Sequence, residues 1–461
     1  MATNTIGVVA PERGIEMRGI ERVSAAERHD VRVFDNFTMW LSANLCLPVV
    51  AVGALAVPVF QMGFWDSALA IMLFNCLGAL PVAFFATLGP KLGLRQMTIS
   101  RFSFGWIGAA VMALVNVAAC IGWSAVPVIV SGQLVYHLTG HHIPIWGGIL
   151  GIAILTAFVS IYGYHYVHRY NRYAWIPMAF IFAVLTTTGA KHFQILPTPM
   201  WSVAELAAFV SFGGAVFGLA TSWSSYAADY NVNQPEGIPS SKVFWLTFLG
   251  VIVPCILMEL LGLALSTGFK GDGAGDLAAG ALKPLGATGT VMLGFLALSV
   301  IAGNIPNDYS LGLSMQVVGR AFSRVNRAVW TVLGAIVYVL IAIPCAGRFD
   351  DTLKNFLLLV AYWLGPWSVI LILEHFVYRK GKYNAEDWDT RTALPAGWAA
   401  MTALALGLVG VYLGAAQTNF VGPLAKMINP PFGMDIGFEL GMVIAGVAYL
   451  MLRPIEIRRG S

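Results

Sequence analysis

Charged residues are scarce in this sequence. Asp, Glu, Lys and Arg make up 11% of its 461 residues and hydrophobic residues 58%, and the mean hydropathy is +0.74. Soluble domains average roughly 25% charged residues, so this composition excludes an ordinary soluble protein. The net charge of +4 comes from basic residues beside apolar runs, where membrane topology explains them. We therefore expect no nucleic-acid partner.

Cysteines and catalytic motifs are also few. The five cysteines all fall inside apolar runs and none has a CxxC spacing, so a disulfide framework and a metal site are not expected. The sequence contains no HExxH motif, no GxSxG elbow and no paired carboxylates at helical spacing. We expect neither an enzyme nor a resident cofactor.

Long apolar runs dominate what is present. Runs of about 20 residues, long enough to cross a bilayer as a helix, begin near residues 37, 64, 105, 145, 173, 208, 243, 288, 328, 353, 393 and 433. They predict an all-α polytopic membrane protein with twelve transmembrane helices. Since the first 36 residues hold no apolar run, no cleavable signal peptide is expected.

The connections between these runs predict the topology. Lys and Arg gather in every second connection, at positions such as Arg95, Arg172, Arg327 and Arg379, and again beyond the last run at Arg458. By the positive-inside rule, both ends of the chain lie in the cytoplasm and the protein is a multi-pass protein of the cell membrane.

Two of the runs are interrupted at corresponding places. The first is broken at Ser42-Ala43-Asn44 and by Pro48. The sixth, VSFGGAVFGLATSWSSYAADY (210–230), combines glycines with hydroxyl residues, Trp223 and Asp229. Polar or unwound backbone at membrane depth is tolerated only where it is buried in protein or lines a cavity. The breaks lie five spans apart, which favours an inverted repeat with a binding site at the bilayer midplane.

This repeat divides the chain into five parts. They are an N-terminal tail (1–36), spans one to five (37–190), spans six to ten (208–377), spans eleven and twelve (393–453) and a C-terminal tail (454–461).

The tryptophans and asparagines near the breaks are candidates for binding a flat ring. Trp123 and Trp223 lie deep in spans three and six beside serines, so their indoles can stack on a heteroaromatic ligand, although membrane tryptophans also form interfacial belts. Asn304 and Asn307 share one helix face, where an amide can pair with the edge of a base or repair the backbone around Pro306.

Three carboxyl groups are candidates for carrying a proton. Glu259 lies well inside span seven, where an unpaired carboxylate favours its neutral form, although a structural hydrogen-bonded glutamic acid is an equal alternative. Asp229 and Asp308 lie nearer the ends of polar segments, where gating or capping roles are also plausible.

Five segments carry a resemblance to a known family. They are residues 63–106, ACIGWSAV (119–126), WSSYAADY (223–230), IPNDYSLGLSMQ (305–316) and YWLGPW (362–367). The chain resembles the purine–cytosine permeases of the nucleobase–cation symporter family over nearly its whole length. The resemblance implies a LeuT-like fold of five-plus-five inverted repeats with broken helices 1 and 6. It also implies alternating access and import of a nucleobase driven by a cation gradient.

The resemblance also assigns roles to particular residues. The stacking tryptophan of span three falls on Trp123, the aromatic of span six on Trp223 and the span-eight asparagine on Asn307. The small residue that meets the ligand falls on Ser222. We count Asn44 and Asn304 with them as substrate-binding candidates.

Two departures from the family pattern bear on substrate and ion. Relatives usually present an Asn or Gln one turn after the span-three tryptophan, where this chain has Pro127, which puts cytosine itself in doubt. Sodium-coupled relatives place two hydroxyl residues before the span-eight asparagine, where this chain has Ile305 and Pro306. A hard cation needs oxygen ligands, so we expect the coupling ion to be H+ rather than Na+.

Several alternatives remain open. The cargo can be allantoin, a hydantoin, thiamine, pyridoxine or another nitrogen heterocycle instead of a cytosine- or purine-type base, and coupling can be to sodium. The expected partners are a small heterocyclic base and membrane lipid, and the protein is a monomer or a homodimer.

Overall fold

The computed structural model describes residues 19–161, 164–198, 202–271 and 273–460. This part of the chain is almost entirely helical, as predicted, and its only strands form one short antiparallel pair, Ala416–Gln417 (β1) and Phe420–Val421 (β2). The long helices are α1 (Asp35–Asn44), α2 (Leu47–Ala54), α3 (Phe64–Ala86), α6 (Arg101–Leu138), α7 (Ile145–Ile161), α8 (Tyr164–Gly189), α9 (Val203–Thr221), α10 (Ser240–Gly268), α12 (Ala287–Val317), α14 (Arg327–Cys345), α15 (Phe349–Leu373), α16 (Trp398–Gly414) and α18 (Gly437–Gly460).

Shorter helices cap or connect the long ones. They are α4 (Leu88–Leu92), α5 (Gln96–Ile99), α11 (Ala274–Leu282), α13 (Arg320–Ser323), α17 (Pro423–Ile428), the π-helix η6 (Glu374–Tyr378) and the 3-10 helices η1 (Ala25–Glu27), η2 (Ala190–His192), η3 (Ser222–Tyr230), η4 (Lys283–Leu285), η5 (Ala346–Arg348) and η7 (Ala385–Asp389).

Each of the twelve predicted spans corresponds to helical structure. Among the described residues, eight helices are long and apolar enough to cross a membrane, or nine if the bent pair α1–α2 is one span. One of the eight, Arg327–Tyr378, contains both α14 and α15, and the 17-residue helices α7 and α16 are apolar but shorter. These helices account for all twelve predicted segments.

The first break lies where the sequence placed it, between Asn44 and Pro48. The α1 and α2 helices meet at a bend of 60°, and the break falls just after Asn44, at Leu45 and Cys46. Pro48 sits in the first turn of α2, where the missing N–H is not needed for an intrahelical hydrogen bond.

The second break begins later than the glycines suggested. The α9 helix continues through Gly213 and Gly218 and tightens into η3 only at Ser222, with non-helical torsions at Tyr226 (φ −145°, ψ 19°). A Cβ at Gly218 would overlap the backbone of Leu357 in α15, and one at Gly213 would overlap a phenylalanine ring of α3. The glycines therefore let neighbouring helices approach and do not weaken α9.

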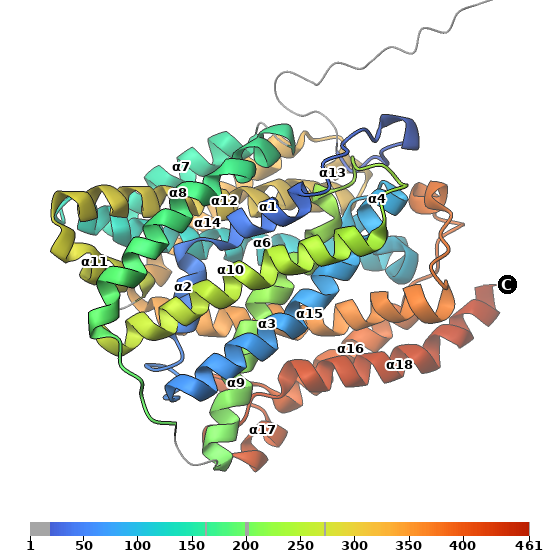
Figure 1. Cartoon of the computed structure of the whole chain (residues 1–461). Helices are drawn as coiled ribbons and strands as arrows, with labels where there is room; N and C mark the ends of the chain where they lie inside the picture. Colours follow the sequence, from blue (N-terminus) through green and yellow to red (C-terminus); the bar gives the residue numbers. More distant parts are fainter. Residues whose placement is uncertain (1–18, 162–163, 199–201, 272, 461) are drawn as a thin grey trace, which may run out of the picture.

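The spans form two groups of four. In the first, which we call the bundle, α3 packs on α9 and α10, and α10 packs on α1 and α2. In the second, which we call the scaffold, α6 packs on α12 and α7, and α14 packs on α6, α7 and α12. The bundle thus contains spans 1, 2, 6 and 7 and the scaffold spans 3, 4, 8 and 9, as a five-plus-five repeat requires (Figure 1).

The fifth and tenth spans take equivalent places. The α8 helix packs on α1 and α12, while α15 packs on α9 and α6. Outside the repeat, α16 and α18 pack on each other and on α15 along one side of the molecule (Figure 1).

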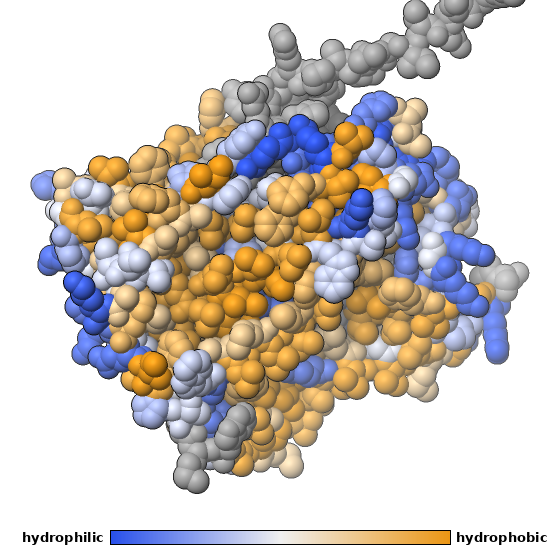
Figure 2. Space-filling model, viewed as in Figure 1, coloured by the Kyte–Doolittle hydropathy of each residue, from blue (hydrophilic) through white to orange (hydrophobic). Residues whose placement is uncertain are grey.

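The surface matches a bilayer environment. A broad apolar band crosses the molecule, and polar side chains gather at two opposite edges (Figure 2). Large apolar side chains such as Ile107, Phe180 and Leu340 are more than 60% exposed, and a broad apolar surface of this kind would be unpartnered in water.

Both ends of the described chain lie at the same end of the molecule. Arg22 forms an ion pair with Glu386 in the connection before α16, and Arg459 stacks over Trp398 at the start of α16. Of the predicted N-terminal tail, residues 1–18 lie outside the described residues, whereas Val23 and Arg28 are buried. Of the predicted C-terminal tail, 454–460 continues α18 and only 461 lies outside.

Candidate functional site

The break in the first span places Asn44 beside Trp223. Asn44 ends α1, and its Nδ2 donates to the carbonyl oxygen of Trp40, one turn earlier in the same helix, at 2.9 Å. Its Oδ1 accepts a hydrogen bond from the indole Nε1 of Trp223 at 2.9 Å. Because both residues are buried, this bond ties the two broken spans together.

The Trp223 indole is enclosed by aromatic rings. Its ring lies 5.1 Å from that of Trp40 and 5.7 Å, edge to face, from that of Tyr226, within the range of favourable aromatic pairs. The neighbouring Ser222 is buried, but its hydroxyl donates to the carbonyl of Leu219 at 2.6 Å within the same helix. Trp223 therefore faces the cluster, while the hydroxyl of Ser222 is used locally.

Asn307 connects the scaffold to the bundle. It lies in α12, and its Oδ1 accepts a hydrogen bond from the Tyr226 hydroxyl at 2.7 Å. Its Nδ2 points to three acceptors, namely the carbonyl of Trp123 at 3.2 Å, Oδ1 of Asn304 at 3.3 Å and the carbonyl of Gly303 at 3.4 Å. Two of these contacts stay within α12, and the third reaches across to α6.

A second contact between α6 and α12 lies directly beside the first. Ser124, which follows Trp123, donates to Oδ1 of Asp308, which follows Asn307, at 3.1 Å. The other carboxylate oxygen accepts from Ser160 of α7 at 3.3 Å. Asp308 is therefore buried inside the scaffold and, like Asn307, it is hydrogen-bonded to α6.

Trp123 lies at the same junction, and among the described residues its indole N–H is an unpaired donor. Its ring is 7% exposed, packs edge to face on Phe356 at 5.1 Å and, within the described chain, its Nε1 has no hydrogen-bond partner. A buried donor left unpaired costs about 1–3 kcal/mol. Neither Trp123 nor Trp223 belongs to an exposed interfacial belt.

Pro127 explains why the Trp123 carbonyl is available. In an α-helix this oxygen would accept from the N–H of residue 127, but proline has none. The α6 helix continues through Pro127, and Asn307 Nδ2 supplies the missing donor. The residue that departs from the family pattern therefore helps to orient Asn307.

These contacts bring most of the predicted site residues into one cluster. Asn44 bonds to Trp223, Trp223 packs on Tyr226, and Tyr226 bonds to Asn307, which reaches the backbone of Trp123. The structure contains no ring contact that joins the Trp123 and Trp223 indoles, so stacking of a ligand between them stays a prediction.

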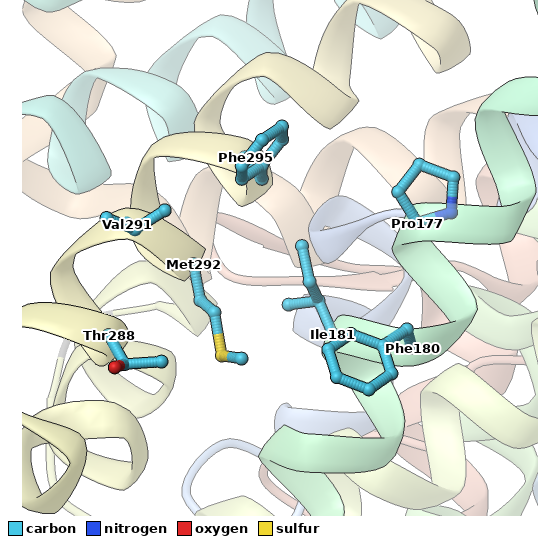
Figure 3. Close-up of a pocket in the computed structure, with 7 residues that line it drawn as sticks. All are labelled: Pro177, Phe180, Ile181, Thr288, Val291, Met292 and Phe295. Atoms are coloured by element: carbon cyan, nitrogen blue, oxygen red, sulfur yellow. The ribbon is translucent and has the colours of Figure 1, made fainter.

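Two pockets open on the apolar outer surface. One, of about 250 Å³, lies between α8 and α12 and is shown in Figure 3; the other, of about 410 Å³, lies between α16 and α18. The first is lined by Pro177, Phe180, Ile181, Thr288, Val291, Met292 and Phe295. Neither pocket is lined by residues of the Asn44–Trp223–Asn307 cluster.

Asp229 lies at the far end of η3, where the bundle meets the scaffold. Its carboxylate accepts from the backbone N–H of Gln96 at 2.8 Å and from the hydroxyl of Ser310 at 3.0 Å. Arg95 donates to its backbone carbonyl. Tyr230 reinforces this junction by donating to the carbonyl of Pro306 at 2.7 Å.

Glu259 lies wholly within the bundle. One carboxylate oxygen accepts from Asn75 of α3 at 2.7 Å, and in the described chain the other has no partner. Gly53 of α2 packs directly on the Glu259 backbone. Among the described residues no group of three His, Cys, Asp or Glu side chains is placed to hold a metal ion.

Sequence reasoning missed Tyr226, Trp40 and Asn75. Tyr226 lies in the polar run of span six and carries the kink of η3, so its position held a signal. Trp40 lies one turn before the first break, and Asn75 is an isolated amide in an apolar run. Their partners lie far away in the sequence, and only packing identifies them.

A family model described as "Permease for cytosine/purines, uracil, thiamine, allantoin" matches residues 22–444. The purine-cytosine permease fcyB of Emericella nidulans is 42% identical over 465 residues, which cover 98% of this chain and 90% of that protein. The purine-cytosine permease FCY21 of Saccharomyces cerevisiae is 36% identical, with coverage of 98% and 88%. A vitamin B6 transporter of the same yeast, TPN1, is 25% identical, with coverage of 97% and 88%.

The fold is similar to that of Mhp1, a nucleobase-cation-symport-1 family transporter solved in a closed conformation with bromovinylhydantoin bound. The TM-score is 0.74 at 14% identity, and the match covers 96% of each chain. This likeness confirms the predicted LeuT-like arrangement of inverted repeats with two broken helices.

Proposed function

This chain belongs to the family of permeases for cytosine/purines, uracil, thiamine and allantoin, and we propose that it imports a cytosine- or purine-type base together with a proton. It is a membrane transporter and not an enzyme. Two relatives at 36–42% identity are purine-cytosine permeases, whereas the vitamin B6 transporter is 25% identical, which favours a nucleobase over a vitamin.

The cluster where the two broken spans meet the scaffold carries this proposal. It combines aromatic faces, at Trp123 and Trp223, with a buried amide at Asn307. A flat heterocycle offers a face for stacking and an edge of donors and acceptors, so it matches both features. Asn44, Ser222 and Asn304 complete the proposed set of substrate-binding residues.

The division into two groups supports transport by alternating access. The base binds from outside between bundle and scaffold, the two groups rock against each other, and base and proton leave on the inside. The bonds between Tyr226 and Asn307 and between Asp229 and Ser310 cross this boundary. They are the contacts that such a movement would remake.

Among the three carboxyl groups, we assign the coupling proton to Asp308. Its two hydroxyl donors come from scaffold helices and one of them, Ser124, adjoins Trp123, so its charge is felt at the substrate site. Glu259 bonds to a residue within its own group, and Asp229 lies beside Arg95. Ile305 and Pro306 offer no side-chain oxygen to a sodium ion.

The protein is proposed to lie in the cell membrane with both ends in the cytoplasm. The shared location of the two ends supports the second point, and the excess of Lys and Arg there gives the direction. It functions as a monomer or a homodimer.

A hydantoin-type cargo is the alternative. Mhp1 was solved with bromovinylhydantoin bound, and Pro127 removes the side-chain amide that relatives present to the base. Allantoin, thiamine, pyridoxine or another nitrogen heterocycle belongs to the same alternative.

Counterflow in proteoliposomes tests the proposal. Proteoliposomes that contain the purified protein are preloaded with unlabelled cytosine, adenine, hypoxanthine, allantoin, hydantoin, thiamine or pyridoxine. Uptake of the same compound in labelled form is then followed with and without an inward proton gradient. We expect exchange of at least one base in preloaded vesicles without a gradient, and net accumulation in vesicles that were not preloaded only when the proton gradient is present. Exchange confined to non-nucleobase compounds would favour the alternative, and accumulation driven by sodium alone would contradict proton coupling.

A further inference from the structure

The amide of Asn307 is fixed in one orientation. Its nitrogen side faces the carbonyls of Trp123 and Gly303 and Oδ1 of Asn304, which are all acceptors. Only an N–H group satisfies acceptors, so the amide nitrogen must lie on that side. The amide oxygen consequently points the other way, toward η3 and Tyr226.

Pro127 contributes to this orientation. With an ordinary residue at this position, the backbone N–H would take the Trp123 carbonyl, and Asn307 Nδ2 would lose its shortest contact. Because proline lacks that N–H, the carbonyl stays open to Asn307 across the α6–α12 junction. The position therefore acts on the site through the backbone of its neighbour.

The amide oxygen of Asn307 accepts a hydrogen bond from Tyr226. The tyrosine belongs to the bundle, at the kink of η3, and its hydroxyl donates to Asn307 Oδ1 in the scaffold at 2.7 Å. Both residues are almost fully buried, at 1% and 2% exposed, so water does not compete for this bond. A ligand that uses Asn307 Oδ1 must displace the hydroxyl.

We propose that Tyr226 is a stand-in donor that the base replaces, and that Pro127 and Asn307 together make the site select heterocycles with an N–H at their polar edge. This inference rests on the proposed function and adds the direction of the hydrogen bond. The base donates a ring N–H or amino hydrogen to Asn307 Oδ1, and the hydroxyl of Tyr226 is released. A ring that offers only acceptors meets a carbonyl oxygen and is rejected.

The test compares three variants in a binding measurement on purified protein with labelled cytosine. Tyr226→Phe removes the competing hydroxyl and leaves Asn307 Oδ1 unpaired, so cytosine should bind about two- to tenfold more tightly, the range that one ordinary hydrogen bond supplies. Pro127→Ala restores the N–H at the Trp123 carbonyl, so cytosine should bind several-fold more weakly. The gain from Tyr226→Phe should also disappear in the double variant.

Tyr230→Phe is the matched control. It removes a hydroxyl from the same short helix, but that hydroxyl contacts the Pro306 carbonyl and Ser310 instead of Asn307. Cytosine affinity should stay within twofold of the wild type. Weaker binding by Tyr226→Phe would overturn the proposal, because the hydroxyl would then be a direct ligand of the base.

A substrate-free measurement separates this inference from the proposed function. The melting temperatures of Tyr226→Phe, Asn307→Ala and the double variant should be non-additive, because the two single changes break the same bond. If the wild type binds none of cytosine, adenine or hypoxanthine while the cycle is non-additive, the proposed function fails and the Tyr226–Asn307 bond stands. Additive melting shifts would overturn the bond itself.

Discussion

At the scale of single residues, the buried carboxyl groups differ in the partners that surround them. Asp308 has two hydroxyl donors in the scaffold, at Ser124 and Ser160, and its carbonyl accepts from Thr331 at 3.2 Å. Hydroxyl groups can donate to a carboxylate or accept from a carboxylic acid. This environment tolerates both protonation states better than a site with a fixed cation.

We predict that Asp308→Asn uncouples transport from the proton gradient. The amide mimics the protonated acid and keeps contacts to both serines, so substrate exchange should persist while gradient-driven accumulation falls to the level reached without a gradient. Uptake by the wild type should rise as external pH falls, and the variant should show no such dependence. Counterflow and net uptake in the same proteoliposomes measure the two properties.

Glu259→Gln is the comparison for this experiment. The glutamine keeps the contact with Asn75 inside the bundle, so accumulation should persist. If accumulation is lost in Glu259→Gln and kept in Asp308→Asn, the assignment of the proton is wrong.

We predict that Trp223→Ala abolishes base uptake. The change removes the stacking face and the donor to Asn44, and a Trp→Ala change in a packed site also costs about 3–5 kcal/mol of stability. Trp223→Phe keeps a ring and should reduce affinity by a smaller factor, since an aromatic pair contributes about 0.5–1.5 kcal/mol. Uptake normalised to the amount of protein in the membrane checks both.

Asn307→Ala tests the polar half of the same site. It should also abolish uptake, because the base loses its hydrogen-bond partner, while protein levels in the membrane stay measurable. Normal uptake by both Trp223→Ala and Asn307→Ala would refute the site.

At the scale of elements, close helix contacts hold the broken span against its neighbour. A Cβ at Gly53 of α2 would overlap the backbone of Glu259, and one at Gly262 of α10 would overlap the carbonyl of Val50. The two glycines therefore let the backbones of α2 and α10 approach each other, as small residues do in membrane helices. The short helix α2 depends on this contact because it has few turns of its own.

Gly53→Ala should therefore destabilise the protein. Overpacking of this kind costs about 1–3 kcal/mol. The atoms that a Cβ at position 53 would meet are backbone atoms of Glu259, which cannot move aside as a flexible side chain can. Gly151→Ala in α7 is the matched control, because no atom lies within 4 Å of its added Cβ. Melting in detergent should show a clear loss for Gly53→Ala and little change, or a small gain, for the control.

At the scale of the whole molecule, a buried charge cluster joins the ten-span repeat to the last two spans. Glu374, in η6 after α15, accepts from Arg453 of α18 at 2.7 and 2.9 Å and from Tyr449 at 2.8 Å. Arg379 donates to the same carboxylate at 2.9 Å, and Arg453 also pairs with Glu456 at 2.7 Å. Each charge in the cluster is compensated, which is the condition for burying charges at all.

Glu374→Ala should detach α18 from the repeat. Removing one member of a buried ion pair costs about 3–5 kcal/mol, because the remaining charge is left without its partner. We expect a lower melting temperature and faster proteolysis around α16 and α18. Lys382→Ala, at an exposed cation of the following connection, serves as the control and should leave both unchanged.

Composition and local pattern were enough to predict that this protein lies in a membrane, that it is helical and where its first span is broken. These properties depend on composition, on runs of about 20 apolar residues and on local interruptions, which are all readable along the chain. The family motifs likewise pointed to Trp123, Trp223 and Asn307, and the structure places these in one buried region. The sequence did not predict that α9 continues through its glycines. A glycine that interrupts a helix and a glycine that lets a neighbouring helix approach cannot be distinguished in a single sequence.

The hydrogen-bond partners of the buried polar groups became known only from the packing of the helices. The pairing of Asn75 with Glu259, of Tyr226 with Asn307 and of Glu374 with Arg453 joins residues between 79 and 184 positions apart. No local pattern specifies such a pair, since it depends on how helices pack. The same holds for Pro127. Its missing N–H matters only because α12 brings the side-chain amide of Asn307 to the Trp123 carbonyl, which is left without its helical donor.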